Sequence, residues 1–376
     1  MEKQTTPRNS HLSHKVYSVS KEFTYAEAGV DRELRAKSKE ALKLLKETYR
    51  FSRYGEVIQL PYGKIFPFAK GYLDFAIEGV GTKVLVAQLA NKYDTIGIDA
   101  VALAVNDVIR SGARPLAIAD NIHAQVSDPE MVEEWMKGIA KGATQAECIV
   151  PGGEIGDVAQ IIKGLMNGKG FDMVVACIGE LSRKDIVYGN NIDPGDVVIG
   201  LPSSGIHSNG VSLARKVLFK RWGGKYELFD VPEGLDREVV YEVLEPMRIY
   251  VKPVIEVSRE YPIKGLVHIT GDAYLKFERL MMFSRGIGFE FNNFKPHPIF
   301  RLIQETASEV RGALTDKEML KTFNMGWGFA VVVDREDADG VIASFEKSGV
   351  EAEQIGTTTD TGKIVASYKG ERIELR

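Results

Sequence analysis

The Glu78–Lys83 segment, Glu-Gly-Val-Gly-Thr-Lys, has the composition of a loop that binds an anion. Glycines at positions 79 and 81 allow the backbone to approach a phosphate closely, and the loop amides can point toward it. Lys83 supplies a positive charge. The spacing differs from both the Walker loop and the dinucleotide-binding fingerprint. The alternative is an ordinary glycine turn followed by a surface lysine.

A second group of polar side chains lies in an apolar stretch, Asp99-Ala-Val-Ala-Leu-Ala-Val-Asn-Asp107. Asp99 and Asn106 are separated by close to two helical turns, so they share one face of the predicted helix. The helix is otherwise apolar nearly all round, which indicates that it is buried. A buried carboxylate needs a partner, and a bound cation is one candidate. The alternative is an N-cap at Asp99 with a buried hydrogen-bonded pair.

Glu154 follows an apolar strand, within Val150-Pro-Gly-Gly-Glu-Ile-Gly-Asp157. A carboxylate flanked by glycines suits Mg²⁺, which takes one or two protein oxygens together with nucleotide phosphates. The alternative is a β-turn with a solvated glutamate.

The run Gly200-Leu-Pro-Ser-Ser-Gly-Ile-His-Ser-Asn-Gly210 places three serines, a histidine and an asparagine in a strand-to-helix turn. Hydroxyl groups and the amides at a helix start together form a cradle for a phosphate or a ribose. No acidic residue is fixed beside His207 in the sequence, so a serine-hydrolase triad is not supported. The alternative is a capping network, which would not need so many hydroxyls. His268-Ile-Thr-Gly271 also places polar residues at the end of a strand.

Strands and helices that alternate along the chain must position these segments. Strands are expected over 72–77, 116–119, 173–178, 197–201, 266–269 and 329–333, and helices over 31–49, 83–91, 99–111 and from 128 and 209. Their β-α-β-β order favours two α+β domains. A polar connector at 182–195 predicts an N-terminal domain 21–182 and a C-terminal domain 183–376. The polar segment 1–20 is expected to be disordered.

Composition limits the classes of function. The 376 residues carry a net charge of −4, so binding to nucleic acid by bulk electrostatics is not expected. No apolar run reaches the roughly 18 residues that span a bilayer, and the polar N-terminus lacks the core of a signal peptide. Cys148 and Cys177 lie in apolar stretches, which indicates buried thiols in a reducing compartment. A cytoplasmic protein without a membrane or nucleic-acid partner is expected.

Taken together and in this order, the segments resemble the phosphoribosylformylglycinamidine cyclo-ligase family, also called AIR synthetase. The resemblance covers most of the chain, from Tyr25-Ala-Glu-Ala-Gly-Val-Asp31 to Phe323-Asn-Met-Gly-Trp-Gly328. Its most specific element is the 200–210 run, followed by Ser212-Leu-Ala-Arg-Lys-Val-Leu218.

The resemblance implies an ATP-dependent ring closure in purine biosynthesis. Formylglycinamidine ribonucleotide becomes aminoimidazole ribonucleotide, with release of ADP and phosphate and with Mg²⁺ as the metal. The substrate's formyl oxygen attacks the γ-phosphate, and the ring-forming nitrogen then displaces phosphate from the activated carbon. The resemblance also implies two α+β domains and a homodimer paired through the N-terminal sheets.

The implied site residues fall on the segments described above. ATP would bind at Gly79, Gly81, Thr82, Lys83 and Asn106. Metal or phosphate contacts would come from Glu78, Asp99, Asp107 and Glu154. The substrate would bind to Ser203, Ser204, His207, Ser208, Asn209 and Thr270. The implied catalytic residues are Lys83, His207 and His268.

Three positions depart from the family's pattern. Glu78 stands where the family usually has Asp, which could shift the metal. Ala26 stands where it usually has Lys, so one phosphate contact is in doubt. Asp272-Ala273 replace expected glycines, so the turn there must differ, and Asp272 could repel a substrate phosphate.

Two other classes of function compete with this hypothesis. One is another ATP-using member of the superfamily; selenophosphate synthetase and the hydrogenase maturation factor usually carry a reactive cysteine at positions where this chain has none. The other is a non-catalytic, nucleotide-responsive binding protein, for which the changes at Ala26, Glu78 and Asp272 would be typical. Retention of Lys83, Asp107 and Glu154 favours the enzyme.

Overall fold

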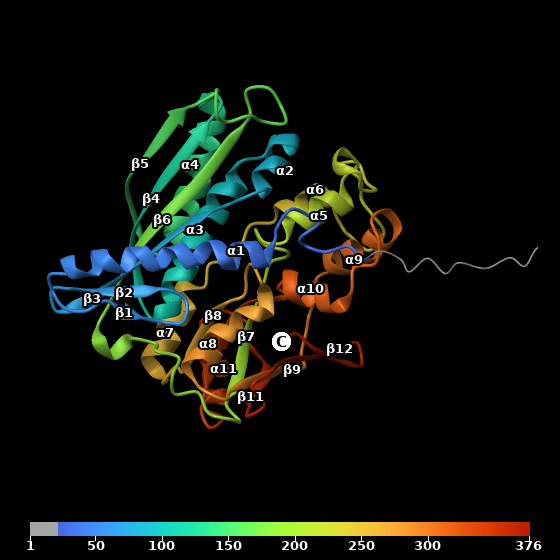
Figure 1. The fold of residues 1–376 in the computed structure, drawn as a ribbon. Coiled ribbons are helices and arrows are strands. Elements are labelled where there is room, and N and C mark those ends of the chain that lie inside the picture. The colour runs from blue at the N-terminus through green and yellow to red at the C-terminus, as the bar shows by residue number, and fades with distance from the viewer. Residues whose placement is uncertain (1–21) are drawn as a thin grey trace, which may run out of the picture.

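Two β-sheets, one in each half of the chain, organise the computed structural model, which describes residues 22–376 (Figure 1). The first sheet has six strands in the order β1-β2-β3-β6-β4-β5, and the second has seven in the order β13-β12-β9-β11-β7-β10-β8. The α+β class predicted from the sequence is confirmed. The predicted disorder of residues 1–20 lies outside the described residues.

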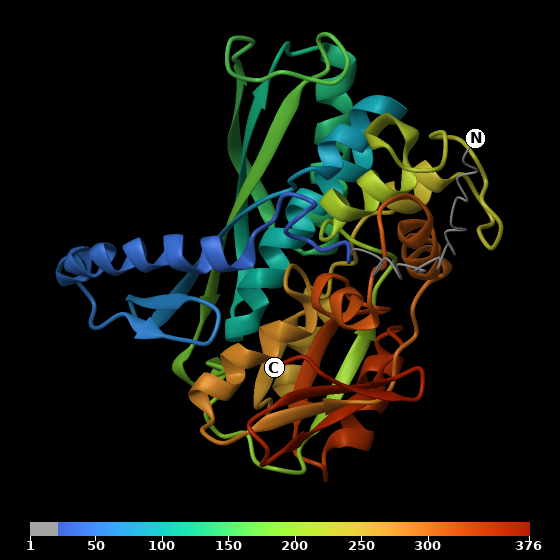
Figure 2. The same ribbon diagram turned by 45° about the vertical axis from the view of Figure 1, so that its right-hand side comes forward.

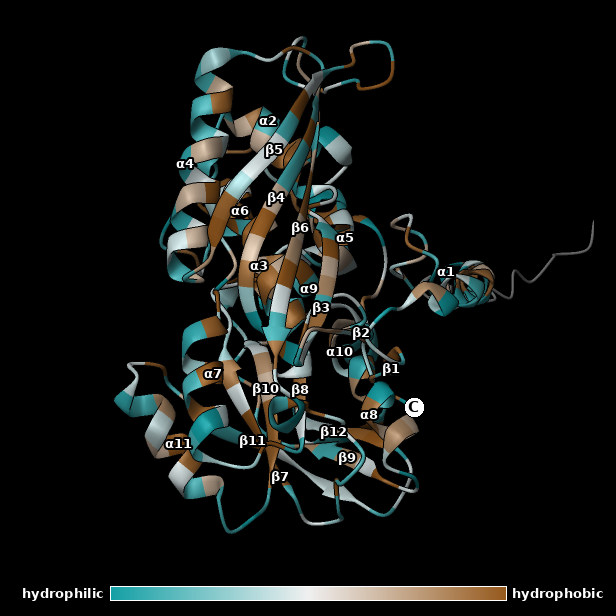
Figure 3. Cartoon of the chain, turned by 90° about the vertical axis from the view of Figure 1, so that its left-hand side faces the viewer, coloured by the Kyte–Doolittle hydropathy of each residue, from teal (hydrophilic) through white to brown (hydrophobic). Residues whose placement is uncertain are grey.

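The first sheet is antiparallel except for the β4–β5 pair, which is parallel. Helices α3 and α4 cover one of its faces, and Figure 3 looks onto the uncovered face. This open face carries exposed apolar side chains, among them Phe75 and Ile77 of β3. The strands are β1 (Ile58–Gln59), β2 (Lys64–Phe68), β3 (Gly71–Gly79), β4 (Arg114–Ala124), β5 (Ile149–Asp157) and β6 (Phe171–Leu181). The helices of this half are α2 (Lys83–Ala90), α3 (Asp94–Val108), η2 (Ile109–Ser111) and α4 (Pro129–Gln145).

In the second sheet, β7 and β10 are apolar and almost entirely buried, as expected for central strands covered on both faces. The strands are β7 (Val197–Pro202), β8 (Gly265–His268), β9 (Gly288–Phe291), β10 (Trp327–Val333), β11 (Glu353–Thr359), β12 (Ile364–Tyr368) and β13 (Glu371–Glu374). The helices are η3 (Arg183–Asp185), α5 (Val211–Leu218), η4 (Lys220–Trp222), α6 (Val239–Leu244), α7 (Val251–Glu260), η5 (Ala273–Phe277), α8 (Glu278–Phe283), α9 (Pro298–Val310), α10 (Asp316–Thr322) and α11 (Ala338–Lys347).

Helix α3 begins at Asp94, five residues before the predicted start. Its N-cap position is Tyr93, so the alternative of an N-cap at Asp99 is wrong. Asp99 and Asn106 are both fully buried, as the apolar pattern around them predicts. Both side chains therefore need partners from elsewhere in the chain.

The N-terminal helix consists of α1 (Arg32–Ser38) and the 3₁₀ segment η1 (Lys39–Phe51), and it extends away from the body of the molecule (Figure 2). Asp31 caps it, because its Oδ1 accepts a hydrogen bond from the Leu34 amide at 2.9 Å. Its apolar side chains are exposed, among them Leu34, Leu42 and Leu45, and no residue of α1 or η1 is buried. Within residues 22–376, no helix has both the length and the apolar character needed to cross a lipid bilayer.

Candidate active site between the two domains

The glycine loop connects β3 to α2 and contacts the second half of the chain. Gly81 has φ +72°, a conformation that favours glycine. Apart from its chain neighbours, no residue of 22–376 has an atom within 4 Å of where a Cβ would be. The Oγ1 atom of Thr82 lies 2.9 Å from the Oγ atom of Ser212 on α5. The loop is therefore brought against the helix that follows the hydroxyl-rich run.

Lys83 lies in the interior rather than at the surface. Its Nζ is 2.7 Å from Asp99 Oδ2 and donates to the Glu245 carbonyl oxygen at 2.7 Å, and both charged side chains are fully buried. Asp99 Oδ1 also accepts a hydrogen bond from the Met247 amide at 2.8 Å. Burial raises the pKa of the Asp99 carboxyl, and the Lys83 ammonium acts against this rise. The cation that Asp99 needs is thus supplied by Lys83.

Asn106 uses its side-chain amide to hold the same segment of the second half. Its Nδ2 donates to the Arg248 carbonyl oxygen at 2.9 Å, and its Oδ1 accepts from the Tyr250 amide at 2.9 Å. Two polar residues on one face of α3, Asp99 and Asn106, therefore hold residues 247–250 by hydrogen bonds. An ATP contact from Asn106 remains a prediction.

Asp107 lies at the end of α3 and contacts two basic side chains. Its Oδ1 is 2.8 Å from His268 Nδ1, and its Oδ2 is 2.6 Å from Arg110 Nη2. Although burial acts in the opposite direction, Arg110 and the hydrogen bond from His268 hold the pKa of Asp107 well below its usual range. An ionised carboxylate can only accept, so His268 Nδ1 carries the proton and Nε2 is left with a free lone pair.

Half-buried Glu78 and fully buried His268 both interact with Asp107, and their pKa values shift in opposite directions. Burial, together with the neighbouring Asp107 carboxylate, raises the pKa of Glu78 to about 7. Burial lowers the pKa of His268 to about 4, although Asp107 acts to raise it. At neutral pH the imidazole is therefore uncharged. A cavity of about 210 Å³ adjoins the cluster and is lined in part by Tyr62, Asp74, Glu78, Asp107 and Arg110.

The pH dependence of stability in metal-free protein follows from these two shifts. Between about pH 4.5 and 7 the folded protein binds more protons at Glu78 than the unfolded chain does, so its contribution to the free energy of unfolding falls as pH rises. Between about pH 4 and 6.5 the unfolded chain binds more protons at His268, so that contribution rises with pH.

Glu78→Gln is therefore expected to gain stability with pH more steeply than the parent between pH 4.5 and 6.5. His268→Asn is expected to gain stability less steeply over the same range. Urea unfolding at a series of pH values measures how the free energy of unfolding changes with pH in each variant. The same pH dependence as the parent in both variants would contradict the pKa shifts assigned to Glu78 and His268.

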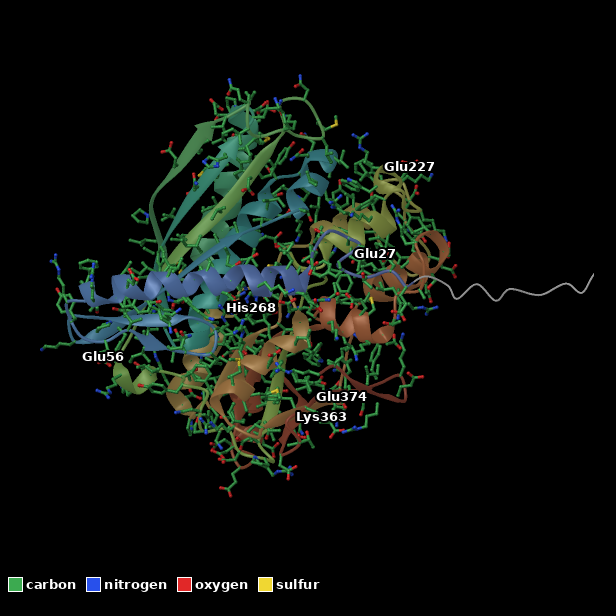
Figure 4. All side chains as sticks on the ribbon, in the orientation of Figure 1. Glu27, Glu56, Glu227, His268, Lys363 and Glu374 are labelled. Atoms are coloured by element: carbon green, nitrogen blue, oxygen red, sulfur yellow. The ribbon has the colours of Figure 1, made fainter. Side chains whose placement is uncertain are left out.

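Three polar atoms at this interface are buried and have no hydrogen-bond partner among the described residues: His207 Nδ1, Asn209 Nδ2 and His268 Nε2. Ser208 lies beside Asp99, and its hydrogen bond acts to lower the pKa of that carboxyl. Buried polar atoms in native proteins are almost always hydrogen-bonded, so the three unpaired atoms are suited to a polar ligand. Figure 4 shows that His268 lies centrally, where the two halves of the chain meet.

His207 adopts an unusual backbone conformation, with φ +60°. Its Nε2 accepts a hydrogen bond from the Ser204 amide at 3.2 Å. Gly328 makes room for the ring, because a Cβ at that position would lie 2.6 Å from His207 Cε1. Burial lowers the pKa of His207 well below its usual value, so this imidazole is also neutral.

The other residues of the hydroxyl-rich run have partners within the fold. Ser203 Oγ donates to Asn324 Oδ1 at 3.0 Å, and Ser204 Oγ donates to the Pro246 carbonyl oxygen at 2.5 Å. Asn324 also donates to the Gly205 carbonyl oxygen, so this buried side chain stabilises the turn of the 200–210 run. The sequence provided no pattern that would select Asn324 as part of the site, although it lies within a segment that carries the resemblance.

Like Asn324, Lys276 was not among the site residues expected from the sequence. It lies on η5, and its Nζ donates to Thr270 Oγ1. Burial lowers the pKa of the Lys276 ammonium to about 8, against the attraction of nearby carboxylates. No motif marks the residue, and only the turn after His268 brings it to the interface.

Glu154 is not brought into this cluster. It is exposed on β5, and the register runs from Gly79 through Val174 and Asn121 to Glu154. Three interstrand steps of about 4.8 Å place its backbone about 14 Å from Gly79. Among residues 22–376, no three His, Cys, Asp or Glu side chains converge as a metal-binding group. Metal binding by Glu154 remains a prediction.

Asp272, one of the three departures from the family pattern, is neutralised by the N-terminal segment. Its Oδ1 is 3.0 Å from Arg32 Nε, and Arg32 also contacts Glu318 Oε1 at 3.0 Å. Near Ala26, Lys216 Nζ donates to the carbonyl oxygen of Glu27 at 3.4 Å. A cation is therefore present beside the position where the family usually has lysine.

The fold and this site define a class of protein: a two-domain α+β enzyme with polar side chains from both domains at the interface. Comparison with known proteins narrows the class. Residues 66–181 match the model for the N-terminal domain of AIR synthase related proteins, and residues 193–369 match the model for the C-terminal domain. The chain belongs to the AIR synthase related family.

Two curated relatives that the chain covers almost completely are named phosphoribosylformylglycinamidine cyclo-ligase. The protein from Methanocaldococcus jannaschii is 38% identical over 369 residues, which cover 94% of this chain and 99% of the relative. The protein from Pyrococcus furiosus is 38% identical, with 92% and 98% covered.

Solved structures share the fold at low sequence identity. E. coli HypE matches with a TM-score of 0.56 at 17% identity, over 81% of this chain and 85% of HypE. T. maritima PurL complexed with ATP matches with a TM-score of 0.53 at 14% identity, over 82% of this chain and 44% of PurL.

Proposed function

We propose that the chain catalyses the ATP-dependent cyclisation of formylglycinamidine ribonucleotide to aminoimidazole ribonucleotide, with release of ADP and phosphate. The observation that supports this most directly is the contact between the glycine loop and the helix after the hydroxyl-rich run, Thr82 to Ser212. It joins a phosphate-binding type of loop to a set of buried, unpaired polar atoms. The name and near-complete coverage of the curated relatives agree with this function.

ATP would bind with its phosphates at the backbone amides of the Gly79–Thr82 loop. The buried Lys83 would act by holding Asp99 and residues 245–247 in place, so that both domains face the nucleotide. Glu78 and Asp107 are the carboxyls best placed to hold Mg²⁺, since their side chains are adjacent and offer only oxygen. When bound there, Mg²⁺ would neutralise phosphate charge.

The substrate would be held by Ser208, Asn209, Thr270 and His207, whose polar atoms face the interface. In the reaction, the formyl oxygen takes the γ-phosphoryl group of ATP, and ADP leaves. The amidine-side nitrogen then attacks the formyl carbon, and phosphate leaves with the former formyl oxygen. His268 Nε2 has the free lone pair needed to accept the hydrogen of the attacking nitrogen. Asp107, on the other ring nitrogen, would hold the imidazole in the required tautomer, as a carboxylate does in hydrolase triads. Much of the contribution is positioning rather than covalent catalysis.

We also propose that the chain forms a cytoplasmic homodimer through the open face of the first sheet. That face exposes large apolar side chains, which on soluble proteins mark interaction surfaces. They are Phe75, Ile77, Leu116 and Ile149, with exposed fractions from 37% to 65%. The net charge of −4 does not favour a nucleic-acid partner.

The decisive measurement is phosphate release from Mg-ATP with and without formylglycinamidine ribonucleotide, with the aminoimidazole product followed in parallel. One phosphate released for each product formed, only with substrate, is the expected result. ATP binding without substrate-dependent release would contradict the proposal. That outcome would favour the alternative of a nucleotide-responsive binding protein or another activity of the superfamily.

A further inference from the structure

The side chain of Arg32, at the start of α1, makes four hydrogen bonds. Its Nε donates to Asp272 Oδ1 at 3.0 Å, and its Nη1 donates to Glu318 Oε1 at 3.0 Å. Its Nη2 donates to the Lys321 carbonyl oxygen at 2.8 Å and to Thr322 Oγ1 at 3.0 Å. All four acceptors belong to the C-terminal half, one just before η5 and three on α10. The planar guanidinium therefore joins the turn before η5 to α10.

The segment that leads into α1, residues 22–31, is attached to the same half of the chain. The Tyr25 amide donates to Glu318 Oε1 at 3.0 Å, the oxygen that also accepts from the guanidinium. Lys216 on α5 donates from its Nζ to the Glu27 carbonyl oxygen at 3.4 Å. The guanidinium is thus anchored by α10 and by its own segment, so it can restrain the turn before η5.

The turn that Arg32 reaches has an unusual backbone. Asp272 has φ +68° and Ala273 has φ +40°, in the left-handed region that favours glycine. The Ala273 amide closes the turn by donating to the Thr270 carbonyl oxygen at 2.6 Å. Such a conformation persists where contacts from the surrounding structure impose it. The ion pair between Arg32 and Asp272 is a contact of this kind.

The same turn borders the proposed substrate site. A Cβ on Gly271 would lie 3.0 Å from Asn209 Oδ1, so the backbone of the turn packs against the Asn209 side chain. The other end of that amide, Nδ2, is buried and has no partner among the described residues. Thr270, a second of the proposed substrate contacts, lies within the turn. A change in the turn would therefore displace two side chains that are proposed to hold the substrate.

We propose that Arg32 is a positioning residue for substrate binding. Through Asp272 it imposes the backbone conformation of the turn, and this conformation places Asn209 and Thr270 for formylglycinamidine ribonucleotide. The inference rests on the proposed function, to which these substrate contacts belong. Because the turn serves binding rather than proton transfer, loss of Arg32 is expected to raise KM and to leave kcat nearly unchanged.

The first test is a steady-state assay of Arg32→Met. KM for formylglycinamidine ribonucleotide is expected to rise by about tenfold, with kcat within about twofold of the parent. Adding Asp272→Gly is expected to return KM to near the parental value, because glycine adopts a positive φ without a partner. Arg35→Met removes an exposed arginine from the same helix and is the matched control, with parental KM expected.

Two substitutions at one position test the backbone argument with Arg32 in place. Asp272→Ala and Asp272→Gly both remove the carboxylate, but only glycine readily adopts φ +68°. Asp272→Ala is therefore expected to raise KM as Arg32→Met does, whereas Asp272→Gly should stay near the parent. Equal KM values in these two variants would overturn the inference, as would a rise in Arg32→Met that Asp272→Gly does not reverse.

Hydrogen exchange measured by mass spectrometry reports on the turn without turnover. The amides of Ala273 and Leu275 are hydrogen-bonded within it. In Arg32→Met, a peptide covering 270–275 is expected to exchange about tenfold faster than in the parent. Parental exchange in the variant would overturn the inference itself. Absence of product formation by the parent would instead contradict the proposed function, so the two failures are distinguishable.

Discussion

Lys83→Met is expected to lower the free energy of unfolding by about 3–5 kcal/mol, because it leaves the Asp99 carboxylate buried without a cation. Both side chains of the pair are 0% exposed, so water cannot replace the lost partner. The variant also loses the bond from Lys83 Nζ to the Glu245 carbonyl oxygen, which joins α2 to the C-terminal half. Urea unfolding followed by circular dichroism measures the loss.

Two controls separate this effect from a general loss of a lysine. Lys83→Met combined with Asp99→Leu removes both charges and is expected to recover most of the stability, since apolar replacements of a buried pair are often neutral. Lys92→Met breaks a pair with Asp94 that is more than a third exposed, and should cost at most about 1 kcal/mol. A Lys83→Met variant with parental stability but weakened ATP binding would contradict the structural role and favour a direct phosphate contact.

His268→Asn is expected to lower kcat for ring closure by about 10²–10⁴-fold, the range typical for loss of a general base. The asparagine amide can replace Nδ1 as the donor to Asp107 but offers nothing at the position of Nε2. Stability near neutral pH should therefore change little. Steady-state assays of product formation, with a urea unfolding curve on the same sample, test both parts.

His268→Gln is the complementary variant, since its amide reaches the position of Nε2 but not that of Nδ1. It leaves Asp107 without its 2.8 Å partner and is expected to be less stable than the parent by about 1–3 kcal/mol. If His268→Asn retained parental kcat, the ring would serve only to pair with Asp107. His207 would then be the remaining candidate for the general base.

Local structure was determined by the sequence itself. The caps at Asp31 and Asp128 are of this kind, because each joins a side chain to amides two or three residues onward and needs no distant part of the chain. The burial of Asp99 and Asn106 also follows from local pattern, since an apolar helix buries every face. Motif order was sufficient to identify the family.

Partners of the buried polar groups were decided only by the tertiary structure. Asp107 and His268 are 161 positions apart, and Asn106 bonds to Tyr250 at a separation of 144. The sequence shows that such side chains need partners but not which residues they meet, because the approach of the two sheets determines this. For that reason the sequence did not predict the pairing of Lys83 with Asp99, and a phosphate contact from Lys83 stays a prediction. Lys276 likewise reaches the interface with no motif to mark it.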